Sequence, residues 1–137
     1  MIRKIAWVFA LVFLLVGALG FVPGVTEDGM LLGIFEVDMV HNLVHLATGL
    51  VAALVALASD KYSRLFFQVF GVVYAAVAVI GFVQGDTVLG LIHANMADHI
   101  LHVAIAAVSL YVGFLWNEKT MAAPAPQPMN MGGGMGA

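Results

Sequence analysis

The sequence predicts an all-α membrane protein, a bundle of four transmembrane helices, and its composition and hydropathy pattern carry that prediction. Of its 137 residues, 63% are hydrophobic and 9% are charged, whereas a soluble domain has about 25% charged residues. The hydrophobic residues fall in four blocks, and a helix that crosses a bilayer needs about 20 such residues in succession. We therefore expect transmembrane helices at about residues 5–22, 40–58, 65–83 and 98–116.

The basic residues predict the orientation of these helices. In a four-pass arrangement all five lie on one side of the membrane: Arg3, Lys4, Lys61, Arg64 and Lys119. Because cytoplasmic loops are enriched in lysine and arginine, we expect both termini to be cytoplasmic. The basic residues form no extended patch, so the expected surroundings are the lipid bilayer and other membrane proteins, and nucleic acid is not an expected partner.

The first hydrophobic block also has features of a secretory signal peptide. Arg3 and Lys4 precede it, and "ALG" at residues 18–20 is a weak cleavage site. The block is long for a signal peptide, and the repeat described next gives it a counterpart in the third block. We therefore expect a retained helix, with cleavage as the alternative.

The two halves of the chain resemble each other. "LGIFEVDMVHNLVH" (32–45) and "LGLIHANMADHILH" (89–102) share leucine, glycine, methionine and histidine at equivalent positions, and "GALGFVPG" is echoed by "AVIGFVQG". These matches predict two helical hairpins, residues 1–58 and 65–117, related by a pseudo-twofold axis along the membrane normal. Together they form the predicted transmembrane domain, 1–117.

Polar residues recur on one face of the second and fourth expected helices, at the spacing i, i+3, i+4, i+7. The second helix carries Asp38, His41, Asn42 and His45, and the fourth carries Asn95, Asp98, His99 and His102. Lipid cannot satisfy polar side chains, so we expect the two faces to turn toward each other near the outer surface. His45 then lies level with His102 across the axis.

One interpretation of this polar pocket is a metal site. His41 and His45 point the same way at i, i+4, and Asp98 and His102 repeat that spacing on the facing helix. These four groups are a suitable ligand set for zinc, copper or iron, because helical bundles build metal sites from such pairs. A variant of this interpretation has haem b held by His45 and His102, with Gly49 and Ala106 leaving room for it.

Two other interpretations of the pocket stay open. In the first, the side chains only hydrogen-bond one another, for example through Asp98 to His41 or His45, and the protein is an accessory or stabilising component of a membrane assembly. In the second, they relay protons, although Gln68 and Ser109 are too isolated to continue a path across the membrane. The chain has no cysteine, and no serine or lysine near a base, so we expect no enzymatic activity.

The pattern "FEVDMVHNLVHLATGLVA", "GVVYAAVAVIGFV" and "LGLIHANMADHILHVAIA" resembles a widespread bacterial family of small four-span membrane proteins of unknown function. The resemblance covers roughly residues 5–116. Its motifs are HNxxH opening the second span, at His41, Asn42 and His45, and an acidic-polar step followed by LH opening the fourth, at Asp98 and His102. His99 stands where the family pattern has asparagine. The resemblance implies the four-span fold and the bacterial cytoplasmic membrane, and no activity.

Two remaining features concern the surface and the tail. Gly71 and Ala75 form a small-xxx-small step that could pack against another subunit or a second copy of the chain. Residues 118–137 are rich in proline, glycine and methionine, without periodicity, and predict a disordered cytoplasmic tail.

Overall fold

The structure, a computed structural model, describes residues 1–117, and the predicted tail lies outside the described residues. Four helices make up most of it: α1 (Ile2–Leu19), α2 (Met39–Ala58), α3 (Asp60–Gln84) and α4 (Met96–Leu110), which continues into a π-helical turn, η1 (Tyr111–Leu115). All four, with η1 counted as part of the last, are long and apolar enough to cross a membrane. The predicted all-α fold class is therefore confirmed.

The helix boundaries differ from those expected wherever a helix continues into polar residues. α1 starts at Ile2, before its two basic residues, and α3 starts at Asp60 rather than near residue 65. Ser59 alone links α2 to α3, and its hydroxyl accepts a hydrogen bond from the Tyr62 N–H at 3.3 Å, which caps α3. Hydropathy identifies only the apolar part of a helix. It therefore does not predict the additional polar turn that a capping residue stabilises.

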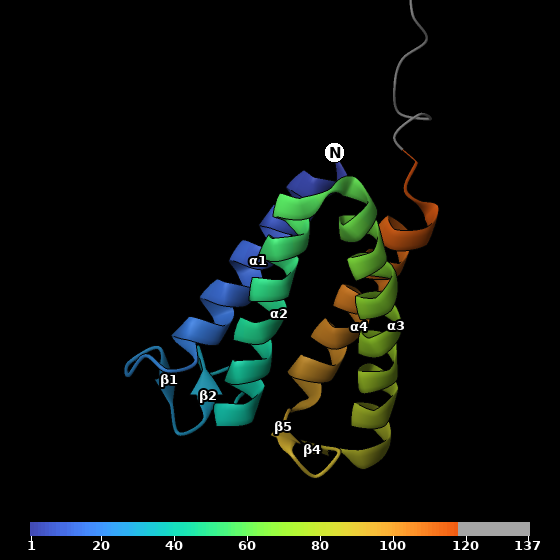
Figure 1. The fold of residues 1–137 in the computed structure, drawn as a ribbon. Coiled ribbons are helices and arrows are strands. Elements are labelled where there is room, and N and C mark those ends of the chain that lie inside the picture. Colours follow the sequence, from blue (N-terminus) through green and yellow to red (C-terminus); the bar gives the residue numbers. More distant parts are fainter. Residues whose placement is uncertain (118–137) are drawn as a thin grey trace, which may run out of the picture.

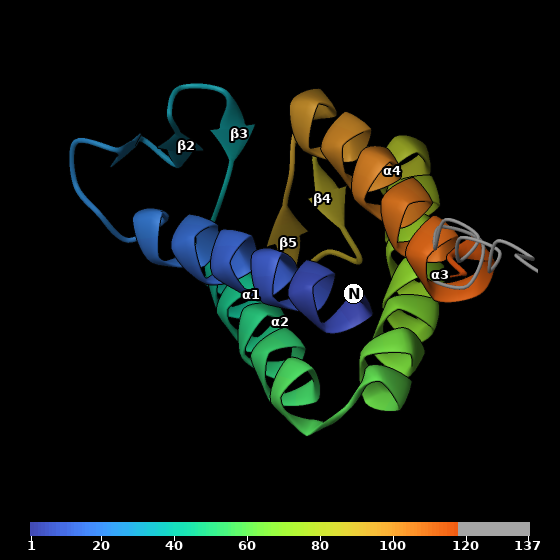
Figure 2. The ribbon, with the colours of Figure 1, turned by 90° about the horizontal axis from the view of Figure 1, so that it is seen from above.

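The helices pair as two hairpins, α1 with α2 and α3 with α4 (Figures 1 and 2). Glycines let the backbones of each pair approach closely. A Cβ at Gly49 of α2 would lie 2.8 Å from the Leu14 nitrogen of α1, and one at Gly71 of α3 would lie 2.9 Å from the Leu110 nitrogen of α4. Gly71 thus packs within its own hairpin, and the prediction that it faces another subunit is wrong, since Leu110 occupies that space.

Both hairpins are closed in the same way at the end where the chain starts, which we call the terminus end. Arg3 donates hydrogen bonds to the carbonyl oxygens of Ala56 (2.7 Å) and Leu57 (3.1 Å). Arg64 does the same for the other hairpin, donating to Trp116 (2.9 Å) and Gly113 (3.3 Å). These guanidinium groups satisfy carbonyls that the last helical turn leaves without partners.

The opposite end, the strand end, carries five short strands. After α1 come β1 (Thr26–Glu27), β2 (Met30–Leu31) and β3 (Phe35–Glu36), and after α3 come β4 (Thr87–Val88) and β5 (Ile92–His93). The antiparallel pairs β2–β3 and β4–β5 have matching turns, in which leucine has a φ of 55° and the following glycine a φ of 68°. These strands were not predicted, because two-residue strands leave no periodicity in the sequence.

The core between the hairpins is layered along the bundle axis. At the terminus end, Ile2, Ala6, Ala56, Phe67 and Val112 form a buried aliphatic and aromatic cluster. In the middle, aromatic rings from α1 and α3 interleave, with the ring centroids of Phe13 5.5 Å from Phe70 and 5.9 Å from Tyr74. The polar residues of the strand end pack against this aromatic layer.

The close approach of α1 and α2 generates a first prediction. Gly49→Val should lower the free energy of unfolding by about 1–3 kcal/mol, because the added side chain meets backbone atoms of α1 that cannot move aside. Unfolding from mild detergent by titration with a denaturing detergent measures the change. Ala47→Val is the control, since Ala47 is exposed on the same helix. Equal losses in both variants would contradict the close packing.

Candidate metal centre

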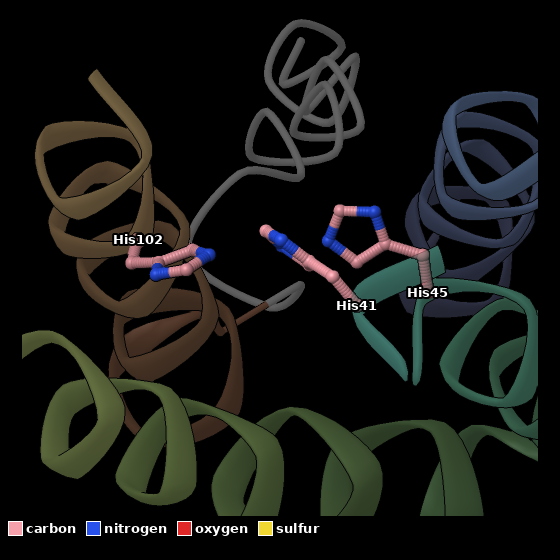
Figure 3. A group of neighbouring side chains, drawn as sticks. All are labelled: His41, His45 and His102. Carbon is pink, nitrogen blue, oxygen red and sulfur yellow. The ribbon is translucent and has the colours of Figure 1, made fainter. Parts of the chain in front are cut away.

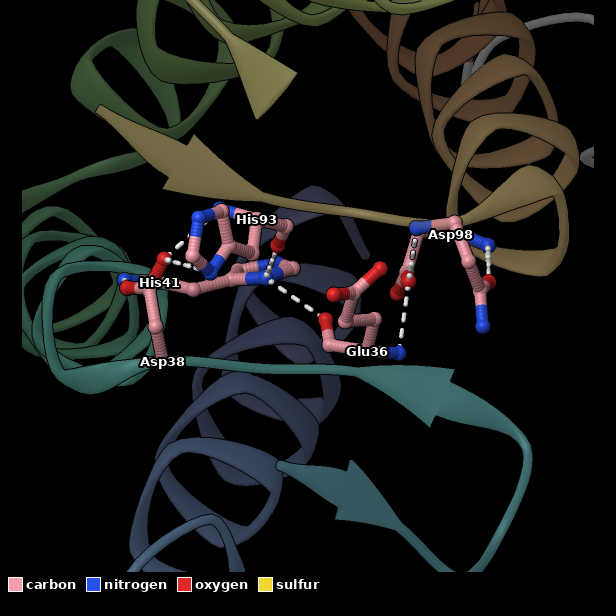
Figure 4. Close-up of polar contacts among 6 residues, drawn as sticks. Glu36, Asp38, His41, His93 and Asp98 are labelled. Carbon is pink, nitrogen blue, oxygen red and sulfur yellow. Dashed lines mark hydrogen bonds and ion pairs between the residues drawn. The ribbon is translucent and has the colours of Figure 1, made fainter. Parts of the chain in front are cut away.

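The two hairpins exchange hydrogen bonds at the strand end through an aspartate on each of two helices, which we call the aspartate clasp (Figure 4). Asp38 caps α2, where its Oδ1 accepts from the His41 N–H at 2.8 Å, and its Oδ2 accepts from the His93 N–H of β5 at 2.6 Å. Asp98 lies in the first turn of α4, where its Oδ2 accepts from the Glu36 N–H of β3 at 2.9 Å. Each carboxylate therefore joins its own helix to the other hairpin.

Asn95 completes the clasp on α4. Its side-chain oxygen accepts from the N–H groups of Ala97 and Asp98, while its own N–H donates to Asp98 at 3.0 Å, which makes a capping box. Its side-chain nitrogen donates to the Ile34 carbonyl of the first hairpin at 2.8 Å. The sequence placed Asp38, Asn95 and Asp98 at the pocket, and their role in the structure is to connect the two hairpins.

Asn42 and His99 have matching places in the two hairpins and lie beside glycines. A Cβ at Gly20 would overlap the Asn42 amide, and one at Gly81 would lie 2.5 Å from the His99 ring. Asn42 donates to the Gly20 carbonyl at 3.0 Å, and His99 Nε2 donates to the Gly85 carbonyl at 3.0 Å. Both predicted pocket residues thus turn toward the preceding helix and away from the polar centre.

Backbone groups of both hairpins hold the ring of His41. Its Nδ1 lies 3.1 Å from the carbonyl oxygen of Glu36 and 2.9 Å from that of His93. A carbonyl can only accept, so Nδ1 carries the hydrogen and donates it to both. In the neutral ring this leaves Nε2 with a free lone pair, the state in which histidine binds a metal.

His41, His45 and His102 form a buried group, the histidine cluster (Figure 3). One nitrogen from each ring lies within 4.8 Å of the other two. The ring centroid of His41 is 4.7 Å from that of His45 and 5.9 Å from that of His102. The three residues are 2%, 8% and 5% exposed, respectively, so α2 and α4 bring three imidazoles together in a setting closed to bulk water.

Asp98, the fourth ligand expected from the sequence, does not belong to this group. Its Oδ2 already accepts from the N–H groups of Glu36 and Asn95, and its carboxylate is not among the donor atoms that converge with the three imidazoles. The physical reason is that Asp98 lies at a helix start, where unpaired N–H groups compete for a carboxylate. The predicted set of four is therefore corrected to three histidines.

The cluster is also not a closed hydrogen-bond network among the described residues. The Nδ1 atoms of His45 and His102 are buried and have no hydrogen-bond partner there. Aromatic rings hold these two histidines from below: the Phe13 ring centroid lies 5.3 Å from His45, and that of Tyr74 lies 5.3 Å from His102. Buried polar nitrogens usually have a hydrogen-bond partner, and these two, like the Nδ1 atom of His99, have none among residues 1–117.

The space around the cluster does not fit haem b. The two cavities that reach the histidines measure about 160 Å³ and about 200 Å³, below the roughly 300–1,000 Å³ typical of cofactor pockets. The His41 ring also occupies space beside both proposed axial ligands, with its centroid 4.7 Å from that of His45 and 5.9 Å from that of His102. The space between His45 and His102 is therefore too small for haem b.

Sequence reasoning missed the backbone partners of the site. Glu36 and His93 are not among the predicted pocket residues, yet their N–H groups donate to Asp98 and Asp38 and their carbonyl oxygens accept from His41. The one available signal was that these two residues occupy equivalent positions in the repeated segments. Backbone groups carry no residue type, so the sequence could not assign them these contacts.

The fold and the cluster define the class: an all-α protein with four helices apolar enough to cross a membrane and three buried histidines at its strand end. Residues 3–115 match a domain of unknown function, DUF4383, and the chain belongs to this family. No curated protein and no solved structure matches the chain.

The clasp generates a prediction about pH. Partial burial acts to raise the pKa of Asp38, but hydrogen bonds from the N–H groups of His93 and His41 hold this pKa below its ordinary value of 3.8. The carboxylate therefore stabilises the fold above that value, and the contribution is lost as the pH falls through the lower, folded-state pKa. Unfolding measured from about pH 6 to about pH 3 should show this loss in the wild type.

Asp38→Asn is the variant that isolates this effect. It should unfold more readily at neutral pH, by about 0.5–2 kcal/mol, because the cap and the clasp lose a charged acceptor. It should also lack the part of the acid loss that Asp38 causes. Asp86→Asn is the control, since that carboxylate is exposed on the same end. An identical acid profile for Asp38→Asn and the wild type would contradict the assignment.

Asp98→Asn tests the corrected ligand set. The change should lower the free energy of unfolding by about 1–3 kcal/mol, because a neutral amide accepts more weakly from the two N–H groups. Any metal bound by the folded protein should stay, as measured by elemental analysis of the purified variant. Metal loss from a folded Asp98→Asn protein would restore Asp98 as a ligand.

Proposed function

We propose that this protein binds a divalent transition metal ion at the histidine cluster. The observation that carries the proposal is the convergence of three buried imidazole nitrogens within 4.8 Å of one another. Imidazole suits zinc, copper, nickel and iron. The chain offers no cysteine and no nearby nucleophile of the usual kinds, so the proposed role is binding rather than catalysis.

The geometry needs only a small contraction to bind an ion. Two nitrogens on a tetrahedral zinc, each about 2.0–2.1 Å from the metal, lie about 3.3 Å apart. Rotation of the His45 and His102 rings about their side-chain torsions would supply that movement, since neither ring is tied by an Nδ1 hydrogen bond within residues 1–117. His41 is the fixed ligand, because both hairpins hold its Nδ1.

Three protein ligands leave one position of a tetrahedral ion open. Structural zinc sites are usually closed by four protein ligands, whereas sites with three bind water or another small ligand. A water molecule needs about 30 Å³, so it would occupy only part of the cavity of about 160 Å³ lined by His41 and His102. The proposed site is therefore one for an ion that exchanges or presents a further ligand.

The orientation and the internal repeat belong to the same proposal. The terminus end carries Arg3, Lys4, Lys61 and Arg64, which supports placing it in the cytoplasm and the histidine cluster near the outer face of a bacterial cytoplasmic membrane. The matching turns, arginine caps and glycine contacts of the two hairpins support a duplication of one helical hairpin. The cluster then draws on both copies, two histidines from the first and one from the second.

A role as an accessory component of a membrane assembly is the second candidate. The clasp and the arginine caps make a rigid bundle whose large apolar side chains face outward, as a protein that packs in lipid against other membrane proteins requires. This role alone leaves the convergence of three histidines without a purpose, which is why metal binding is preferred.

Metal content tests the proposal. Protein purified in mild detergent without a histidine tag, then dialysed against buffered Zn²⁺, should contain about one ion per chain. His41→Ala, His45→Ala and His102→Ala should each weaken binding by about 100-fold or more, since ligands matter more than the outer partners that cost 10–100-fold. Cobalt substitution gives a visible spectrum as a second readout.

His99→Asn is the matched control. His99 is a buried histidine on the same helix as His102, but it points to Gly85 and lies outside the cluster. This variant should keep its ion, and His41→Gln, which preserves a hydrogen-bonding group, should lose it. A folded wild-type protein that binds no Zn²⁺, Cu²⁺ or Fe²⁺ would refute metal binding and leave the accessory role.

A further inference from the structure

The two seams between the hairpins are looser than the hairpins themselves, and each contains a cavity that reaches the histidine cluster. On one side, between α2 and α3, a cavity of about 160 Å³ is lined by His41, His102 and Tyr74. On the other, between α1 and α4, a cavity of about 200 Å³ is lined by His45 and Phe13. Apart from histidine, the side chains that line both are almost wholly apolar.

A larger groove on the side of the bundle lies next to the cavity between α2 and α3. This groove measures about 420 Å³ and runs along Val51, Val55, Leu65 and Val69. The two spaces share Thr48, Phe70 and Val73. The apolar groove therefore adjoins the cavity that reaches two members of the histidine cluster, and these three residues lie at their junction.

The chemistry of these two spaces restricts what would occupy them. No lysine or arginine of residues 1–117 lines either space, so an anionic phospholipid head or a fatty acid carboxylate would find no counter-ion. The inner cavity is instead lined by His102 and Tyr74, two residues whose neutral side chains can donate a hydrogen bond. Its lining also includes the aromatic rings of Phe70 and Tyr74, which pack on each other with centroids 4.2 Å apart.

These features fit a long apolar molecule with a flat, neutral head that accepts hydrogen bonds. We propose that the seam between α2 and α3 is a lateral binding site for an isoprenoid quinone. Its head lies beside His102 and Tyr74, and its tail lies in the groove along Val51 and Val69. The site needs no metal, because imidazole and phenol hydrogens suffice to bind the quinone carbonyl groups.

Equilibrium binding of a radiolabelled short-tail quinone to the full chain in lipid nanodiscs tests the proposal. Val73→Trp should weaken binding about tenfold or more, because the new ring fills the junction of the two spaces. Tyr74→Phe should weaken it about three- to tenfold through the lost hydrogen bond. Val72→Trp is the matched control, since Val72 is exposed on the same helix and lines neither space, and it should bind like the wild type.

The measurement also separates this proposal from metal binding. Val73→Trp should keep its Zn²⁺ content, and the metal-free wild type should still bind the quinone, so either function can fail alone. If Val73→Trp does not fold, Val51→Trp obstructs the groove farther from the core. Absence of saturable binding, equal binding by Val73→Trp and Val72→Trp, or equal competition by a fatty acid would each overturn the quinone assignment.

Discussion

The exchange of hydrogen bonds between the two hairpins is the constraint on which the rest of this structure depends. Asp38 accepts from the N–H of His93 at 2.6 Å, and Asp98 accepts from that of Glu36 at 2.9 Å. Within a bilayer no hydrophobic force drives helices together, so specific polar contacts must set how two hairpins meet. Without this clasp, apolar packing and the hydrogen bond from His41 to the His93 carbonyl would be left to fix the register of the seams.

The clasp and the histidine cluster share His41, and that makes them one unit. The carbonyl oxygens that hold Nδ1 of His41 belong to Glu36 and His93, the same residues whose N–H groups bind the two aspartates. The N–H groups of these two residues therefore join the hairpins, and their carbonyl oxygens orient the ring of His41. A metal bound at His41 would be sensitive to how the two hairpins are joined.

The division between tight hairpins and looser seams explains why the same fold can be both rigid and accessible. Glycines let backbones approach within each hairpin, as at Gly49 and Gly71, while the seams are filled by large rings such as Phe13, Phe70 and Tyr74. Rings pack with gaps that small residues do not leave, and those gaps reach the histidines from either side. The two cavities beside the histidines therefore follow from how the core is built.

The sequence by itself determined the four apolar helices, the polar faces of α2 and α4, and the burial of their histidines, because lipid forces polar side chains inward wherever helical periodicity aligns them. Only the tertiary structure decided which side chains meet. Asp98 and His102 share one helical face, yet the Asp98 carboxylate accepts hydrogen bonds from N–H groups at the helix start. His99 turns instead toward the glycine at position 81. Helical periodicity predicts only the direction in which a side chain leaves its own helix. The contacts of that side chain depend on backbone groups of the other hairpin, and every residue type carries the same backbone groups.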